Sequence, residues 1–169
     1  SNYFEQALEA NPVWANSLGL KQGEGKLGDP GIRSQTRMER LRQDTLRQLD
    51  GMAVHELNAD QQLDRLAIRS MLTAECEDFE RGVHSLDPDG VDHVFGVLLH
   101  ELQRGEDEPA RARRNIESVL KEAPRFLRKA SGIVVNPERV WRRIMVQSAA
   151  GADAMFGAVK AFMGDSSAK

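Results

Sequence analysis

Apolar side chains recur at intervals of three and four residues along most of this chain, the spacing that places them on one face of an α-helix. The longest such stretch follows Asn58, whose side chain can cap a helix, and runs over about 59–86. A second follows the start signal Asn136-Pro137 and runs over about 138–163. The pattern therefore predicts two long helices.

Two sets of apolar residues lie within the first of these segments. The earlier set is Leu63, Leu66 and Ala67, and the later set continues at near-heptad spacing through Ile68, Leu72, Cys76, Phe79 and Val83. A helix of this length would be on the order of 40 Å long, enough to span a domain. We expect Cys76 to be a small core residue of the later set rather than a reactive thiol.

Shorter helical patterns fill the rest of the chain. They cover Tyr3–Ala10, the stretch after Asn11, 34–49, 91–103, and a segment from Pro109 in which Pro124 is expected to cause a kink. Residues 133–135 are β-branched and could be extended. We expect an all-α protein, a single domain over 1–169 that forms an irregular bundle of about six or seven helices around the two long ones.

The stretch from Asn11 to Leu20 carries the sharpest local signals. Asn11 can cap a helix that Pro12 begins, Trp14 offers a large packing anchor, and Gly19 suits a left-handed residue after the last turn. The glycine-rich loop that follows, up to Gly31, lacks the Gly-x-x-x-x-Gly-Lys-Ser/Thr order of a phosphate-binding loop. We expect this loop to be a mobile connector.

Composition narrows the class of partner. Charged residues make up 29% of the chain and apolar residues 40%, which suits amphipathic helices with solvated outer faces. A formal net charge of −3 gives no reason to expect nucleic acid as a partner, and no apolar run approaches the length of a membrane span.

The single cysteine rules out an internal disulfide and suits a reducing compartment. We expect a cytoplasmic protein, although the opening Ser1-Asn2 resembles a cloning remnant and leaves a secreted or lipoprotein origin open.

Two His-Glu pairs raise the question of a zinc site. A His-Glu-x-x-His site needs a second histidine three residues after the glutamate, so that both ligands share a helix face. After His55-Glu56 that position holds Ala59, and after His100-Glu101 it holds Arg104. Neither pair has the motif.

The remaining candidates are also incomplete. His93 and His100 lie seven residues apart and could share a helix face, but a chance surface pairing explains this spacing better. The acidic residues at 75, 77, 78 and 80 fall on more than one face, and the arginines between 33 and 47 are interleaved with acids as on a solvated face. We therefore assign no catalytic, cofactor-binding or metal-binding residue to this chain.

Several segments together resemble the start of the bacterial proteins grouped as domain of unknown function 885. They are Asn11-Pro12-Val13-Trp14-Ala15, Ser17-Leu18-Gly19, Leu27-Gly28-Asp29, Leu57-Asn58-Ala59-Asp60-Gln61-Gln62-Leu63-Asp64-Arg65 and Ala123-Pro124-Arg125-Phe126-Leu127. The resemblance covers nearly all of this chain but only the opening part of a typical member.

Members of that family are large helical proteins similar to zinc carboxypeptidases and related gluzincin-type peptidases. Their metal site, a His-Glu motif with a nearby His-His pair, lies in the C-terminal part and has no counterpart here. The resemblance implies that this chain is a non-catalytic N-terminal portion, a wall or lid of the cleft for a peptide substrate. Its partner would be the C-terminal part of the same protein, which would hold the zinc, while the chain itself would need no cofactor.

Two other functions stay open. The chain could be a free-standing helical interaction module without enzymatic activity, or a bundle that binds a small molecule, although no polar residue falls clearly on a core stripe. An exposed apolar face could also support a homodimer.

Overall fold

Helices account for the fold throughout the described part of the chain, residues 3–86 and 89–164, and no strand occurs there. In this computed structural model the α-helices are α1 (Tyr3–Ala10), α2 (Pro12–Ser17), α3 (Ile32–Asp50), α4 (Ala59–Glu80), α5 (Gly90–Arg104), α6 (Pro109–Ile133), α7 (Arg139–Ala150) and α8 (Ala152–Gly164). The connections include the 3-10 turns η1 (Lys21–Gly23), η2 (Val54–Glu56) and η3 (Val83–Ser85). The predicted all-α class is confirmed.

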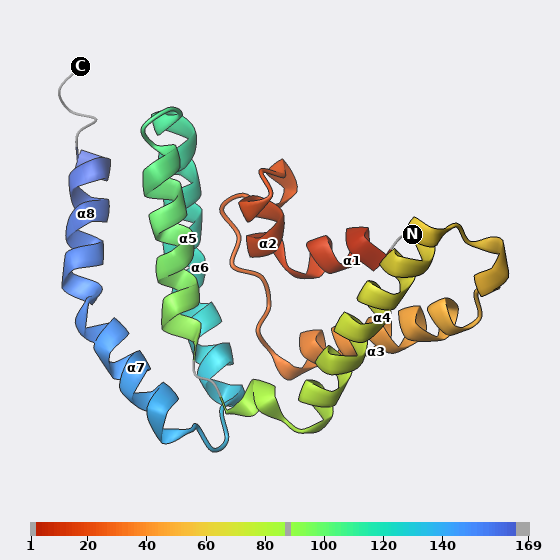
Figure 1. Cartoon of the computed structure of the whole chain (residues 1–169). Coiled ribbons are helices and arrows are strands. Elements are labelled where there is room, and N and C mark those ends of the chain that lie inside the picture. The colour runs from red at the N-terminus through yellow and green to blue at the C-terminus, as the bar shows by residue number, and fades with distance from the viewer. Residues whose placement is uncertain (1–2, 87–88, 165–169) are drawn as a thin grey trace.

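Two groups of helices, which we call the N-terminal and C-terminal arms, give the molecule an open shape (Figure 1). In the N-terminal arm, α3 and α4 form a hairpin and α1 packs on α3. In the C-terminal arm, α5 and α6 pair closely while α7 and α8 lie against α5. The short helix α2 and the loop after it lie between the arms (Figure 1).

Glycines interrupt both of the predicted long helices. α4 begins after the Asn58 cap, as predicted, but it ends at Glu80 instead of Leu86, because Gly82 adopts a left-handed backbone with φ of 73°. The predicted helix over 138–163 is divided at Gly151 into α7 and α8. Glycine is a poor helix former, so this is the weakest point of the segment. If α7 and α8 are counted as one interrupted helix, the described residues form seven.

The helix from Pro109 continues through Pro124 without a break and ends at Ile133. The expected extended stretch is therefore shorter than predicted, since Ile133 is helical and the backbone becomes extended at Val134. The next residue, Val135, donates its backbone N–H to the carbonyl of Ser85 at 3.1 Å, which fastens this connection to η3.

The main core lies in the C-terminal arm. Its buried members are Leu27, Val94, Val97, Leu98, Ile116, Val119, Ala123, Phe126 and Val159, which come from α5, α6, α8 and the glycine-rich loop. Leu27 is only 2% exposed, so the loop expected to be a mobile connector is packed into the core instead. Among the described residues, no helix is both long enough and apolar enough to cross a membrane.

Candidate functional site

The stretch from Asn11 to Leu20 begins and ends as its sequence predicts. The Asn11 side chain accepts a hydrogen bond from the Trp14 backbone N–H at 3.0 Å, Pro12 is the first residue of α2, and Gly19 is left-handed. Trp14, expected to be the packing anchor, is instead 38% exposed and makes an edge-to-face contact with Phe4. The buried residues of this helix include Asn16.

Asn16 belongs to a buried polar network centred on Glu101, which is fully buried. The Glu101 carboxylate accepts hydrogen bonds from Asn16 Nδ2 at 3.0 Å, from Arg104 Nη1 at 2.8 Å and from Asn115 Nδ2 at 3.0 Å. Arg104 Nη2 also donates to Asn16 Oδ1 at 2.8 Å and to His100 Nε2 at 3.1 Å. Arg104, which stands where a zinc motif needs histidine, is thus a hydrogen-bond donor of this network. The network ties α2 to α5 and α6.

The other candidates from the sequence do not form a reactive centre. His55 and Glu56 are both exposed, with side chains 85% and 74% accessible. Cys76 is buried, and its burial, together with a hydrogen bond to Glu39, raises the pKa of the thiol to about 11. The thiol is therefore protonated near neutral pH, which suits the predicted core role. In the described ranges, no three His, Cys, Asp or Glu side chains converge as metal ligands would.

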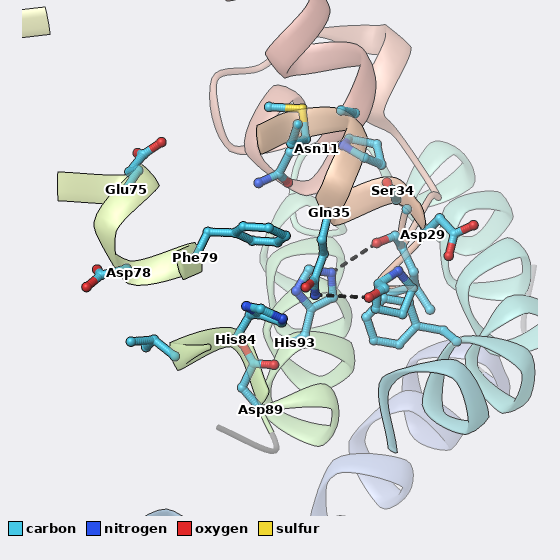
Figure 2. A pocket seen from close by; sticks show the side chains of 18 of the residues that line it. Asn11, Asp29, Ser34, Gln35, Glu75, Asp78, Phe79, His84, Asp89 and His93 are labelled. Carbon is cyan, nitrogen blue, oxygen red and sulfur yellow. Dashed lines mark hydrogen bonds between the residues drawn. The ribbon is translucent and has the colours of Figure 1, made fainter. Parts of the chain in front are cut away.

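A pocket with a volume of about 490 Å³ lies between the two arms, and we call it the interarm pocket (Figure 2). Its walls come from the loop before α3, the start of α3, the end of α4, η3, α5 and α6. Gln35, Phe79, His84 and His93 point toward a common space in Figure 2. An adjoining cavity of about 680 Å³ shares Gln35, His84 and Asp89 with it.

Two histidines of the interarm pocket stack on phenylalanine rings. His84 lies 4.6 Å from Phe79 and His93 lies 4.8 Å from Phe126, measured between ring centroids, with the rings nearly parallel. His93 Nε2 lies 3.1 Å from the carbonyl oxygen of Leu27. Because a carbonyl only accepts, this nitrogen carries the proton, and Nδ1 of the neutral ring is an acceptor.

The amide of Gln35 is oriented by the same reasoning. Its Nε2 donates to the carbonyl of Pro30 at 3.1 Å, which fixes Oε1 on the other side of the amide. Oε1 is buried and has no hydrogen-bond partner among the described residues, and the same holds for Nδ1 of His84. A buried polar atom without a partner typically costs about 1–3 kcal/mol, so a structure retains few of them. Two such atoms, Oε1 of Gln35 and Nδ1 of His84, therefore belong to residues that line the interarm pocket.

Carboxylates outnumber cations among the residues that line the interarm pocket. Asp29, Glu75, Asp78 and Asp89 contribute negative charge, while Arg42 contributes the positive charge. The Arg42 guanidinium lies 2.6 Å from a Glu75 oxygen and 3.6 Å from Glu39, so these carboxylates already neutralise it. Lys129 hydrogen-bonds Asp29 at 2.7 Å and holds the pKa of that carboxyl below its ordinary value.

Asp89 is exposed and forms no ion pair with any described residue, and Figure 2 shows it beside His84. Asp78 also lacks an ion pair there, but its carboxylate is turned away from the pocket centre in Figure 2. The charge of the pocket lining is therefore negative, and Asp89 is its unpaired carboxylate next to His84.

Linear spacing gave no signal for this pocket. Gln35, His84, His93 and Phe126 come from four different elements that only the packing of the arms brings together. The pairing considered in the sequence was His93 with His100, and the structure separates them. His93 lines the pocket, whereas His100 contacts Arg104 in the Glu101 network.

The fold and the pocket define an all-α protein with an acceptor-rich cavity between two helical arms. Comparison of the chain with protein-family models, with characterised proteins and with solved structures finds no match.

Proposed function

We propose that this chain is a non-catalytic helical portion of a larger, zinc-dependent peptidase-like protein, in which it forms one wall of the substrate cleft. The observation that carries the proposal is that α4 has apolar residues on two sides while the chain covers only one of them. The likeness of the segments at Asn11 and Leu57 to the start of such proteins supports the class of the larger protein.

The covered side of α4 carries Leu72 and Cys76, which are 0% and 8% exposed. The uncovered side, which we call the outer face of α4, carries Leu63 at 66% exposure and Leu66 at 58%. A helix that is apolar on both sides is typical of one buried between two layers. The chain supplies one layer, the α3 helix, so the proposed larger protein supplies the other.

A second uncovered surface lies on α7. Val140, Trp141 and Ile144 are all exposed, and they fall on one side of the helix. The same helix carries Arg139, Arg142 and Arg143 and contains no acidic residue. Apolar surface of this extent, rimmed by charge, marks an interaction surface.

The proposal is tested with the full-length protein. We expect it to contain zinc and to hydrolyse peptides, and we expect Leu63→Glu combined with Leu66→Glu to abolish hydrolysis by separating α4 from its cover. The pair Gln48→Glu and Gln103→Glu, which adds two carboxylates at exposed polar positions, is the matched control and should leave hydrolysis unchanged. Activity that survives deletion of residues 1–169 would contradict the cleft-wall role.

The same outer faces also favour the second candidate, a free-standing helical interaction module. The length of the natural reading frame separates the two functions. A frame that continues for several hundred residues beyond Lys169 supports the cleft-wall function, and a frame that ends near Lys169 supports the interaction module.

A further inference from the structure

We propose that the interarm pocket binds a guanidinium group, such as the side chain of an arginine residue in a peptide or a free arginine derivative. This inference concerns the pocket of this chain and does not depend on the peptidase-like function proposed above.

Charge is the first argument. The lining has more carboxylates than cations, its Arg42 is already neutralised by Glu75 and Glu39, and Asp89 is left without an ion pair in the described structure. A cation would gain from this balance, whereas an anion would face Asp89 and Glu75 without a free cation to bind.

Hydrogen bonding is the second argument, and it favours guanidinium over a simple ammonium. The lining residues supply acceptors from different walls: Oε1 of Gln35, the carboxylate of Asp89 and, in the neutral ring, Nδ1 of His93. Guanidinium has five N–H donors in a fixed plane and no acceptor, so it can serve several walls at once. A donor near Gln35 would also relieve the acceptor that the chain leaves without a partner.

Shape is the third argument. The ring pairs Phe79–His84 and Phe126–His93 give the pocket flat walls, against which a planar cation can stack. A volume of about 490 Å³ lies in the ordinary range for small-molecule sites and exceeds what one arginine side chain fills. The site therefore suits the end of a longer ligand.

The decisive experiment compares two probes that differ in charge but hardly in shape. Nα-acetyl-arginine amide and Nα-acetyl-citrulline amide are titrated into the ¹⁵N-labelled chain, and NMR shifts of the Gln35 side-chain amide and the His84 and His93 rings are followed. We expect saturable shifts at these groups with the arginine probe only, weaker at high salt. Equal binding of the citrulline probe, shifts that map elsewhere, or no saturable shift would overturn the proposal.

Variants make the test independent of the probe. Gln35→Lys places an ammonium among the acceptors and is expected to abolish arginine binding. Asp89→Asn is expected to weaken it about two- to fivefold, as for loss of one partly screened charge. Asp64→Asn removes the same charge from α4 outside the pocket lining and should have no effect. Unchanged affinity in Asp89→Asn, or an equal loss in Asp64→Asn, would contradict the site; should Gln35→Lys fail to fold, these two variants decide.

Discussion

At the scale of single residues, the best-defined group is the buried carboxylate of Glu101. It is fully buried, and its partner Arg104 is 15% exposed, so neither charge is well solvated. Such a pair adds little compared with an apolar pair of the same shape, but breaking it is costly because one charge is left unpaired. We therefore assign the Glu101 network a role in fixing α2 against α5 and α6.

The first prediction concerns Arg104. Arg104→Met keeps the length of the side chain but removes the charge, and we expect the free energy of unfolding to fall by about 3–5 kcal/mol in urea titrations. Glu101→Gln added to this variant should recover part of the loss, because it removes the unpaired charge.

The control for that experiment is Arg81→Met, which breaks an exposed pair with Glu77 whose side chains are 70% and 53% accessible. Its effect should stay within about 0.5 kcal/mol. A loss at Arg104 no larger than the loss at Arg81 would show that Glu101 is solvated or otherwise compensated.

At the scale of elements, capping residues and prolines predicted the starts of α2, α4 and α6, whereas α7 begins at Arg139, two residues after the expected Asn136-Pro137 signal. Asn58 forms a full capping box with Gln61, and Pro12 and Pro109 begin their helices. Helix ends were less predictable, because Gly82 and Gly151 each lie within an apolar pattern that continues past them. The pattern records which residues are apolar, whereas the break depends on the backbone that each glycine adopts. Gly82 is left-handed, with φ of 73°, while Gly151 leaves the helix with a right-handed backbone at φ of −79° and ψ of −2°.

The candidate pocket was out of reach for a related reason. The sequence places Gln35, His84 and His93 on their own elements, but nothing local determines which elements meet. The apolar pattern of α4 has the same limit: Leu63 and Leu72 look alike in sequence, yet one is 66% exposed and the other 0%. What covers a face is a property of the assembled molecule.

A prediction at this scale concerns the packing of η1 against α2. A Cβ at Gly23 would lie 2.1 Å from the Pro12 carbonyl oxygen and 2.6 Å from the Asn16 backbone nitrogen, so Gly23→Ala must push the two elements apart. We expect a clear loss of stability, on the order of 1–3 kcal/mol, as for overpacking.

Gly96 is the matched control for Gly23. It is exposed within α5, and a Cβ there meets no atom within 4 Å. Gly96→Ala should raise the free energy of unfolding by about 0.4–1 kcal/mol, since alanine restricts the unfolded chain and favours the helix. If both alanine variants shifted stability in the same direction, the close approach of η1 and α2 would not be what requires glycine.

At the scale of the whole molecule, the two arms are joined by the segment between them. Leu27 is inserted into the core of the C-terminal arm, Arg111 of α6 hydrogen-bonds Glu24 at 2.8 Å, and Lys129 of α6 pairs with Asp29. The Arg111 hydrogen bond also lowers the pKa of the Glu24 carboxyl. The α3–α4 hairpin lies further from this core, and the outer face of α4 is exposed to solvent. The helices of the hairpin therefore depend on fewer buried contacts.

This unequal packing leads to a prediction for amide hydrogen exchange. In the isolated chain, amides of α5 and α6 around Leu98 and Ile116 should exchange most slowly, and those of α4 and α7 should exchange faster because one side of each helix is uncovered. In the full-length protein, α4 around Leu63 and α7 around Ile144 should gain the most protection, while α5 and α6 change little. Mass spectrometry of peptides from both proteins measures this difference directly.

Protection that increases evenly over all helices would indicate general stabilisation. No increase at α4 and α7 would mean that their outer faces stay uncovered in the larger protein, which would contradict the cleft-wall function.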